Sequence, residues 1–426
     1  MCDCHTDSEL LTQFHEHGNM KMKDWKEYRL GEMIQCNPQV KLEKGKSYTL
    51  IDIDSIEIGS RYVKGKELTE YDGQSGCHFQ NGDTVMARIT PCLENGKIAQ
   101  VQCESQKGFG STELFVFRGM ENKTDSNYVF NLMSMQFIRD LAANSMTGAS
   151  GRQRADLGFI KRIKWNFPPL PTQQKIASIL SAYDNLIQNY KKQIEALQTA
   201  ASELYKEWFV RFRFPGWQNA EFENGIPEGW KVERLGNLAE IKSGKRLPQG
   251  YDFSDYPTRH PYIRARDIKH GNIDSNDFAY ISDEVYQKLK RYIVDENDIL
   301  LTIVANIGDV GYVNKSLQGF NLTENAVRLT NYSKRIEPRY LCYYLSQPAT
   351  KIYMEGLAVG AAQAKLGIYK IETIKVLLPN INIQKDFSRR ITLIHTKIDN
   401  LNKQITNLTQ QRDLLLPRLM SGKLEI

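Results

Sequence analysis

The sequence predicts an α/β (α+β) fold with two similar globular domains of mixed β-sheet and helices, joined by two long helices. Three observations lead to this prediction. The chain repeats itself, since WKEYRLG at Trp25 returns as WKVERLG at Trp230 with five of seven positions identical. Short β-rich runs alternate with Gly, Asn and Asp turns inside each copy. A long heptad pattern then closes each copy.

The repeat extends over most of each half. NGDTVMARI at Asn81 returns as ENDILLTIV at Glu296, and GFGSTELFVF at Gly108 returns as GFNLTENAVR at Gly319. This alignment matches Asp83 with Asp298, Thr112 and Glu113 with Thr323 and Glu324, and Gln153 with Gln363. A repeat of this length is a duplicated domain, unlike the units of about 20–50 residues that build solenoids. The chain is therefore expected to hold two similar sites.

The first copy has the pattern of a mixed α/β domain. Its β-rich runs are SYTLIDI, DTVMARI, KIAQVQ and ELFVFRG, and a helix is predicted at Tyr128–Ala143. The segment NFPPLPTQQ then ends the domain, because its prolines at 168, 169 and 171 interrupt the strand pattern. Thr172 is expected to cap the helix that follows.

Apolar residues then recur at alternating spacings of four and three over four heptads, and the same stripe returns 211 residues later. A single long amphipathic helix cannot bury its stripe alone, so the two helices are expected to pair; pairing with another protein is the alternative. Arg412 interrupts the second stripe, and its head is expected to reach solvent. The helix-pairing positions are Ile176, Leu180, Tyr183, Ile187, Ile194 and Leu197 with Phe387, Ile391, Ile398, Ile405 and Leu408.

These patterns divide the chain into six segments. A turn-rich linker containing Pro215, Gly216, Gly225 and Pro227 separates the halves, and Pro417 is expected to shorten the last helix. The predicted segments are an N-terminal arm (1–24), a first domain (25–170), a central helix (171–213), the linker (214–229), a second domain (230–379) and a C-terminal helix (380–426).

Composition fits a cytoplasmic protein with two cores. The 426 residues are 41% hydrophobic, and the formal net charge of +6 is compatible with a nucleic-acid partner. No apolar run approaches the roughly 18 residues of a membrane-spanning helix, and the N-terminus lacks a signal-peptide pattern. Of the seven cysteines only Cys342 lies in the second copy, whereas a disulfide framework would recur in both. Reduced thiols are therefore expected.

The sequence predicts no catalytic residue, no metal site and no cofactor bound by this chain. NFPP at 166–169 has the wrong order for the loop of an amino-methyltransferase, and EKGKS at 43–47 lacks the first glycine of a phosphate-binding loop. Cys2, Cys4 and nearby histidines lack the usual spacing of zinc ligands, so a disordered tail is the better interpretation.

Each copy carries a Gly- and Ser- or Ala-rich loop followed by a basic residue, MTGASGRQRADLG at 146–158 and VGAAQAKLG at 359–367. Such loops approach a nucleic-acid backbone closely, and Arg, Gln and Asn contact base edges. A solvated surface loop is the alternative, but recurrence at equivalent positions favours binding.

A second basic cluster comprises residues 242–246 with Arg264 and Arg266, and it corresponds to Arg61, Lys64 and Lys66 in the first copy. These side chains are expected either to contact phosphate groups or only to keep the protein surface soluble. Arg88 corresponds to Ile303, a difference expected if the copies read different sequences. The candidates for contact with nucleic acid are Arg61, Lys64, Arg88, Ser150, Arg152, Gln153 and Arg154 in the first copy and Lys242, Ser243, Lys245, Arg264, Arg266, Thr302, Asn306, Gln363 and Lys365 in the second.

The chain resembles the specificity subunits of type I restriction-modification systems over residues 25–426. The resemblance rests on the two WK…RLG openings, on LPTQQKIASILSAYDNLIQNYKKQIEAL, and on the junction from ASELYKEWFVRFRFPGW to GIPEGWKVERLG. It implies that each half is a target recognition domain followed by a helix. It further implies that the two helices pack as an antiparallel coiled coil, and that the domains are related by a pseudo-two-fold axis.

The resemblance also implies a function without catalysis. Such a subunit recognises a split double-stranded DNA target and recruits two methyltransferase subunits, which use S-adenosylmethionine, and two restriction subunits, which use ATP and Mg. The C-terminal helix lacks the Trp-Phe-Val ending of the central one, so the two docking surfaces for the methyltransferase are expected to differ. A coiled-coil adaptor without DNA recognition is the alternative, although it would not need the paired basic loops.

Overall fold

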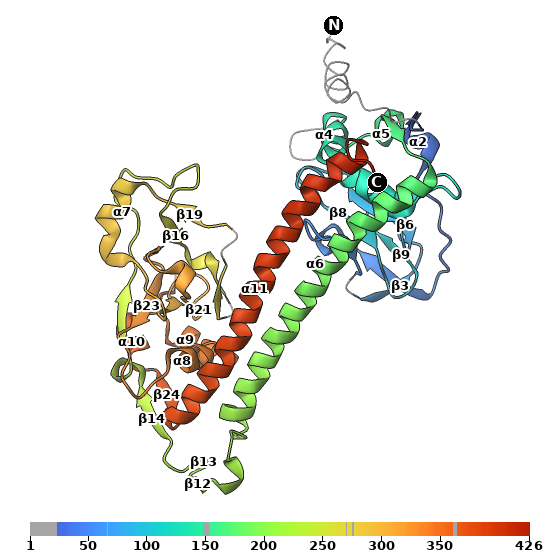
Figure 1. Ribbon diagram of the computed structural model, residues 1–426. Helices are drawn as coiled ribbons and strands as arrows, with labels where there is room; N and C mark the ends of the chain where they lie inside the picture. Colours follow the sequence, from blue (N-terminus) through green and yellow to red (C-terminus); the bar gives the residue numbers. More distant parts are fainter. Residues whose placement is uncertain (1–23, 66, 148–152, 270, 275–276, 361–363) are drawn as a thin grey trace. The chain divides into compact units, whose positions relative to one another are not determined.

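The computed structural model describes residues 24–65, 67–147, 153–269, 271–274, 277–360 and 364–426 (Figure 1). The chain forms two compact units. The first comprises the residues up to 192 together with 401–426, and the second comprises 193–400. Each unit thus contains one globular domain and a part of both long helices. The predicted arm, except for Asp24, lies outside the described residues.

The first unit is built around a five-stranded sheet whose central strand, β7 (Thr84–Ala87), is buried on both faces. Alternate residues of β7 face different cores, because Met86 packs against the helices and Val85 and Ala87 against the second sheet. The five-stranded sheet has the order β2 (Ile34–Cys36), β10 (Leu114–Gly119), β7, β8 (Ile98–Val101) and β4 (Tyr62–Val63). The second sheet has the order β5 (Leu68–Tyr71), β3 (Lys46–Ile51), β9 (Lys107–Gly110) and β6 (Cys77–Gln80).

Helices and a strand pair complete the first domain. The predicted helix at 128–143 is interrupted at Met135, so that two shorter helices form there. The remaining elements are α2 (Leu30–Met33), α3 (Ser126–Ser134), α4 (Gln136–Asn144) and α5 (Leu157–Arg162), with β1 (Lys26–Arg29) antiparallel to β11 (Lys164–Phe167).

The second unit repeats this plan with a shorter sheet of order β15 (Glu240–Ser243), β23 (Ala326–Thr330), β20 (Ile299–Thr302) and β21 (Val310–Tyr312). A smaller three-stranded sheet has the order β19 (Ala279–Tyr280), β16 (Pro261–Ile263) and β22 (Asn321–Leu322). The remaining strands form three pairs, β17 (Ile268–Lys269) with β18 (Asn272–Ile273), β12 (Phe222–Glu223) with β13 (Ile226–Pro227), and β14 (Lys231–Arg234) with β24 (Lys375–Leu378). Its helices are α7 (Asp283–Leu289), α8 (Pro338–Leu345), α9 (Pro348–Leu357) and α10 (Ile368–Ile371).

The strand registers show which residues of the two domains correspond. Leu114 pairs with Ala87 in the first unit, and Ala326 pairs with Thr302 in the second. Leu114 therefore corresponds to Ala326, and Glu113 corresponds to Asn325. The sequence alignment, which matched Glu113 with Glu324, is wrong by one residue here because β23 begins one residue later.

One aspartate has the same role in both sheets. Asp83 accepts a hydrogen bond from Gln80 N at 2.8 Å and pairs with Arg118 at 2.6 Å. Asp298 accepts from Asp295 N at 2.9 Å and pairs with Arg328 at 2.9 Å. Each carboxylate thus closes the turn before the central strand and neutralises an arginine on the neighbouring strand.

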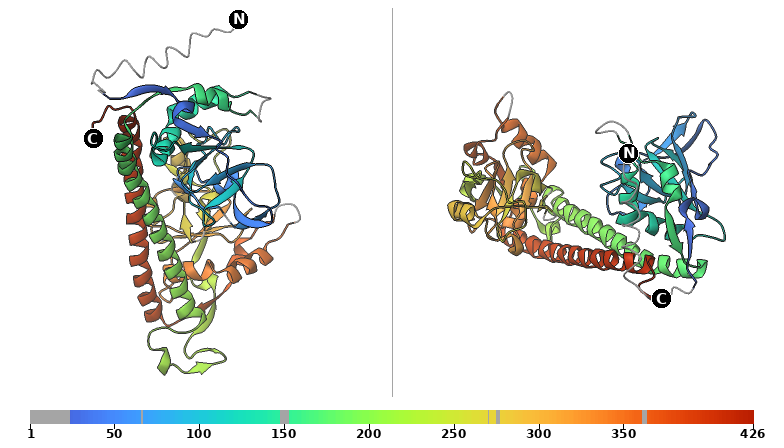
Figure 2. Two further views of the ribbon diagram at one scale, coloured as in Figure 1. Left: turned by 90° about the vertical axis from the view of Figure 1, so that its right-hand side faces the viewer. Right: turned by 90° about the horizontal axis from the view of Figure 1, so that it is seen from above.

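Within each unit, the segments of the two long helices, α6 (Leu170–Tyr205) and α11 (Ile381–Met420), lie side by side in antiparallel directions (Figure 2). In the first unit the end of α11, with Leu419, shares a core with Ile176 and Leu180 near the start of α6. In the second unit the ring centres of Phe387, near the start of α11, and Trp208, just beyond the end of α6, lie 6.0 Å apart. The antiparallel helix pair implied by the family resemblance is confirmed.

The predicted stripe faces inward along both helices. Ile176, Leu180, Ile187, Phe387, Ile391 and Ile398 are buried, and Tyr183, Ile194, Leu197, Ile405 and Leu408 are half-buried.

Three expectations for these helices are wrong. Thr172 is not the cap, because α6 begins at Leu170 and both Thr172 N and Gln173 N donate to Pro169 O. Pro417 lies inside α11, where it removes only one hydrogen bond of the last turn. The Arg412 side chain is only 18% exposed, because it pairs with Asp184 rather than with water.

A buried glutamine at the start of each helix holds the domain against it. Gln173 Nε2 donates to Lys123 O and Pro168 O at 3.0 and 2.9 Å, and its Oε1 accepts from Asp125 N at 3.1 Å. Gln384, 211 residues later, makes the same three bonds with Arg335 O, Pro379 O and Glu337 N at 3.1, 2.8 and 3.0 Å. Both glutamines are 0% exposed, so each fixes a helix to its domain.

Replacing Gln173 with alanine should lower the free energy of unfolding of the first unit by about 2–4 kcal/mol, because three backbone groups lose their partner out of water. Hydrogen exchange measured against urea on peptides from α3 and the start of α6 reports this change. The matched control is Gln174→Ala, because Gln174 is exposed one residue further along the same helix. Equal midpoints for the two variants would contradict the structural role of Gln173.

Candidate nucleic-acid interface

The basic loop of the first domain is fastened to the segment that follows the central strand. Thr147 and Arg154 exchange two backbone hydrogen bonds of 3.1 Å. Ala155 N donates to Arg88 O at 2.8 Å, and Thr90 N donates to Gln153 O at 3.1 Å. The base of the loop therefore lies at the end of β7. Ser150 and Arg152, at the centre of the loop, lie outside the described residues.

The second domain anchors its loop with the same bonds. Val359 N and Lys365 N each donate to the other residue's carbonyl, at 3.2 and 3.0 Å, and Leu366 N donates to Ile303 O at 3.0 Å. Arg154 therefore corresponds to Lys365, and Arg88 corresponds to Ile303.

This pairing corrects one part of the sequence alignment. Because Arg154 corresponds to Lys365, Gln153 corresponds to Ala364 and not to Gln363. Gln363 lies outside the described residues.

Two guanidinium groups gather at the loop base of the first domain. Arg154 binds the Glu113 carboxylate through both Nη2 and Nε, the Nη2–Oε1 distance being 2.5 Å, and this hydrogen bonding lowers the pKa of Glu113. The Arg88 guanidinium lies 5.1 Å from the ring centre of Phe115. Arg88 also lines a surface groove of about 490 Å³ formed with residues 37–41 and 76–78. One carboxylate thus faces two arginines, which leaves net positive charge beside an open groove.

In the second domain Asn306, on the turn after β20, and Lys365, at the base of the loop, are both exposed. Contrary to the expectation from the sequence, Thr302 does not contact nucleic acid. Its side chain is 0% exposed, and its hydroxyl donates to Asn306 O. Asp309 N donates to the same hydroxyl at 3.0 Å. Thr302 therefore shapes the turn rather than reading a base.

The basic cluster at the end of β15 lies at this same end of the sheet. Gly244 N donates to Ala326 O at 3.1 Å, and Ala326 is the residue that pairs with Thr302. Ser243 and Lys245 are exposed, whereas Lys242 is half-buried and pairs with Glu240 at 3.0 Å. The structure thus brings Ser243 and Lys245 to the sheet end that carries Asn306 and Lys365.

Four other candidates do not join these sites. Arg264 pairs with Asp267 at 2.9 Å, and Arg266 pairs with Asp277 at 2.7 Å, so carboxylates neutralise both charges. Lys64 is exposed just after the edge strand β4, two strands away from β7. Arg61 does not fit phosphate contact, because its side chain is 2% exposed and bound to Asp184.

Sequence reasoning missed the apolar neighbours of the second loop. Val359 and Tyr369 are 67% and 65% exposed on either side of Lys365. Recurrence could not reveal them, because the first domain has Thr147 where the second has Val359. Sequence reasoning also missed the ion pair of Glu113 with Arg154. Predicting this pair would have required knowing that the loop returns to the end of β7.

Two further properties concern the described residues only. No group of His, Cys, Asp or Glu among them could hold a metal ion. The helices of this part of the chain are too short or too polar to span a membrane. Cys2, Cys4 and the neighbouring histidines lie outside it.

The model of the type I restriction modification DNA specificity domain matches residues 22–199 and again 227–410. The chain belongs to this family. The type I restriction enzyme MjaIX specificity subunit of Methanocaldococcus jannaschii is 30% identical over 306 residues, which are 70% of this chain and 68% of that protein. The putative MjaX specificity subunit of the same organism is 25% identical over 444 residues, covering 98% of this chain and 99% of the relative.

A solved structure supports the fold. The crystal structure of the type I restriction-modification S subunit from M. genitalium has a TM-score of 0.56 and 16% identity, covering 95% of this chain and 97% of that one. The two separate family matches confirm two recognition domains. The chain is therefore a non-catalytic specificity subunit that recognises DNA sequence for a type I complex, and it is not a coiled-coil adaptor.

Replacing Lys365 with alanine should weaken binding to target duplex and reduce the salt slope of the association constant by about 0.9, because one phosphate contact is lost. Titrations between about 50 and 200 mM salt measure this slope. Lys375→Ala is the control, because Lys375 is exposed on β24, outside the sheet that carries the loop. Equal slopes for the two variants would show that Lys365 does not contact the backbone.

Proposed function

We propose that this specificity subunit binds a bipartite double-stranded DNA target, one half per domain, and positions methyltransferase and restriction subunits on it. One observation carries the proposal. The two domains present a loop through the same backbone hydrogen bonds, at the same end of the central strand, but with different side chains. A shared frame with unlike side chains is suited to reading two unlike half-sites.

The side chains favour different chemistry in the two halves. Arg88 borders a groove, and a guanidinium fork suits the O6 and N7 acceptors of guanine. In the second domain the loop offers the exposed Val359 beside Lys365, and Asn306 is exposed on the turn after β20. An apolar side chain suits the methyl group of thymine. Lys245 and Ser243 suit phosphate oxygens, which position a protein without reading sequence.

The proposed partners follow the duplication. With one recognition domain per half-site, we place one methyltransferase subunit beside each domain, and two restriction subunits complete the assembly. Leu186, Leu393 and Leu414 are exposed on the long helices, and such apolar side chains favour protein contact. We assign S-adenosylmethionine, ATP and Mg to the partner subunits and place the complex in the cytoplasm, where it meets DNA.

Long-read mapping of modified adenines in cells that express this chain with its methyltransferase tests the proposal. One split motif with two unlike halves is expected, because each domain reads on its own. A single contiguous motif would contradict it. A gel shift adds a second check, since specific duplex binding should strengthen when the methyltransferase is present.

A further inference from the structure

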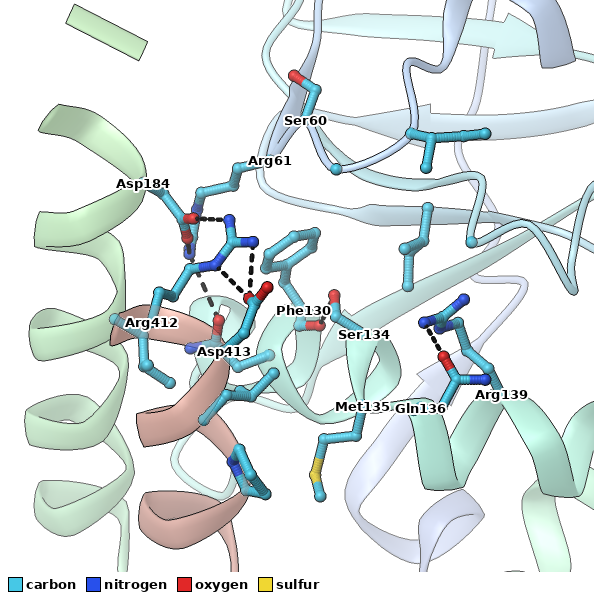
Figure 3. A pocket seen from close by; sticks show the side chains of 18 of the residues that line it. Ser60, Arg61, Phe130, Ser134, Met135, Gln136, Arg139, Asp184, Arg412 and Asp413 are labelled. Carbon is cyan, nitrogen blue, oxygen red and sulfur yellow. Dashed lines mark hydrogen bonds and ion pairs between the residues drawn. The ribbon is translucent and has the colours of Figure 1, made fainter. Parts of the chain in front are cut away.

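In the first unit three charged side chains from three separate elements meet out of water (Figure 3). Arg61 comes from the segment leading into β4, Asp184 from α6 and Arg412 from α11. Asp184 Oδ2 lies 2.9 Å from Arg61 Nη1, and Asp184 Oδ1 lies 2.7 Å from Arg412 Nη1. The side chains are 2%, 4% and 18% exposed for Arg61, Asp184 and Arg412. We name this group the charge triad.

The rest of the domain holds Arg61 in one orientation. Its Nη2 donates to Asn127 Oδ1 at 2.9 Å and to Gln100 Oε1 at 3.3 Å, and its guanidinium carbon lies 4.7 Å from the ring centre of Phe130. These polar neighbours of Arg61 are amides, so Asp184 supplies the carboxylate that binds both Arg61 and Arg412. Asp413 binds Arg412 alone, at 2.8 Å. The Asp184 carboxylate therefore links the globular domain to both long helices.

The charge triad supplies direction that the surrounding apolar contacts lack. Ile176 and Leu180 of α6 share a core with Leu416 and Leu419 of α11 and with the domain. Apolar burial of this kind is non-directional, so similar packing survives small rotations. A rotation that separates Asp184 from Arg61 leaves the Arg61 guanidinium without a carboxylate out of water, which is strongly unfavourable. One orientation of the domain on the helices is thereby favoured.

The equivalent position in the second unit has no such triad. With the offset of 211 residues between the helices, His395 replaces Asp184 and Ala201 replaces Arg412. His395 Nε2 lies 3.0 Å from Tyr343 Oη, and burial lowers the pKa of His395 to about 4, so the imidazole is neutral at neutral pH. This joint is an uncharged hydrogen bond beside an aromatic cluster of Tyr205, Phe209 and Phe387.

We infer that Asp184 is a positioning residue, which fixes the first recognition domain on the long helices and so makes DNA binding selective for the spacing between half-sites. The inference rests on the proposed function. Adding one base pair to a spacer moves a half-site by about 3.4 Å and rotates it by about 35°. A domain held by a directional charge triad cannot follow that movement, whereas one held by apolar packing alone can adjust.

The test is a triple variant, Arg61→Met with Asp184→Leu and Arg412→Met. Removing all three charges together leaves no buried charge unpaired, because Asp413, which loses its partner Arg412, is 57% exposed to water. Such replacements are often neutral or stabilising. Circular dichroism should show a folded chain with an unchanged or higher melting temperature. Duplexes with the mapped spacer, and with one base pair more or less, are then titrated with the subunit assembled with its methyltransferase. The preference for the mapped spacer should fall by about tenfold or more.

Tyr343→Phe is the matched control, because it removes the uncharged hydrogen bond at the equivalent joint of the second unit. It should keep the spacer preference of the wild type. An unchanged preference in the folded triple variant would overturn the inference, because the triad would then only stabilise. Equal relaxation in Tyr343→Phe would also overturn it. If the wild type binds no split duplex at all, the proposed function fails and takes the inference with it.

Discussion

The structure depends on two apolar stripes that neither long helix can bury alone. α6 and α11 contain 36 and 40 residues, and each carries its stripe along much of its length. The stripes cover each other, and each globular core is completed by residues of both helices. Ile176 and Leu419 belong to the core of the first unit, whereas Tyr205 and Phe387 belong to that of the second. Removing the pairing would therefore expose apolar surface in both domains and not only along the helices.

On these paired helices, the two domains share one set of structural hydrogen bonds but differ in the side chains at the loop base. The constant part includes backbone hydrogen bonds, since the loop bridges at Arg154 and Lys365 use only N–H and C=O groups. Asp83 and Asp298 close equivalent turns, and Gln173 and Gln384 clamp equivalent helix starts. Side chains at the loop base are then free to differ. This separation explains how one scaffold carries two different recognition surfaces.

Much of the fold could be predicted because local patterns determine it. Each repeated motif, each heptad stripe and each recurring loop is a pattern formed by residues close together in sequence. The errors arose where a distant partner decides the outcome. From the sequence, Arg61 was expected to be a surface cation, but the carboxylate that binds it belongs to Asp184, 123 residues away. Arg412 looked like a solvated interruption of the stripe, yet it is bound by Asp184 across 228 residues. Thr302 is buried because its hydroxyl forms hydrogen bonds that shape the turn after β20.

Exchange of one recognition domain tests most directly whether the two domains read DNA independently on their shared scaffold. Residues 230–379 are replaced by the corresponding segment of another family member, and modified adenines are mapped in cells that express the chimaera with the methyltransferase. One half of the split motif should change to that of the donor, while the other half stays as it was. A change in both halves, or in neither, would contradict the account.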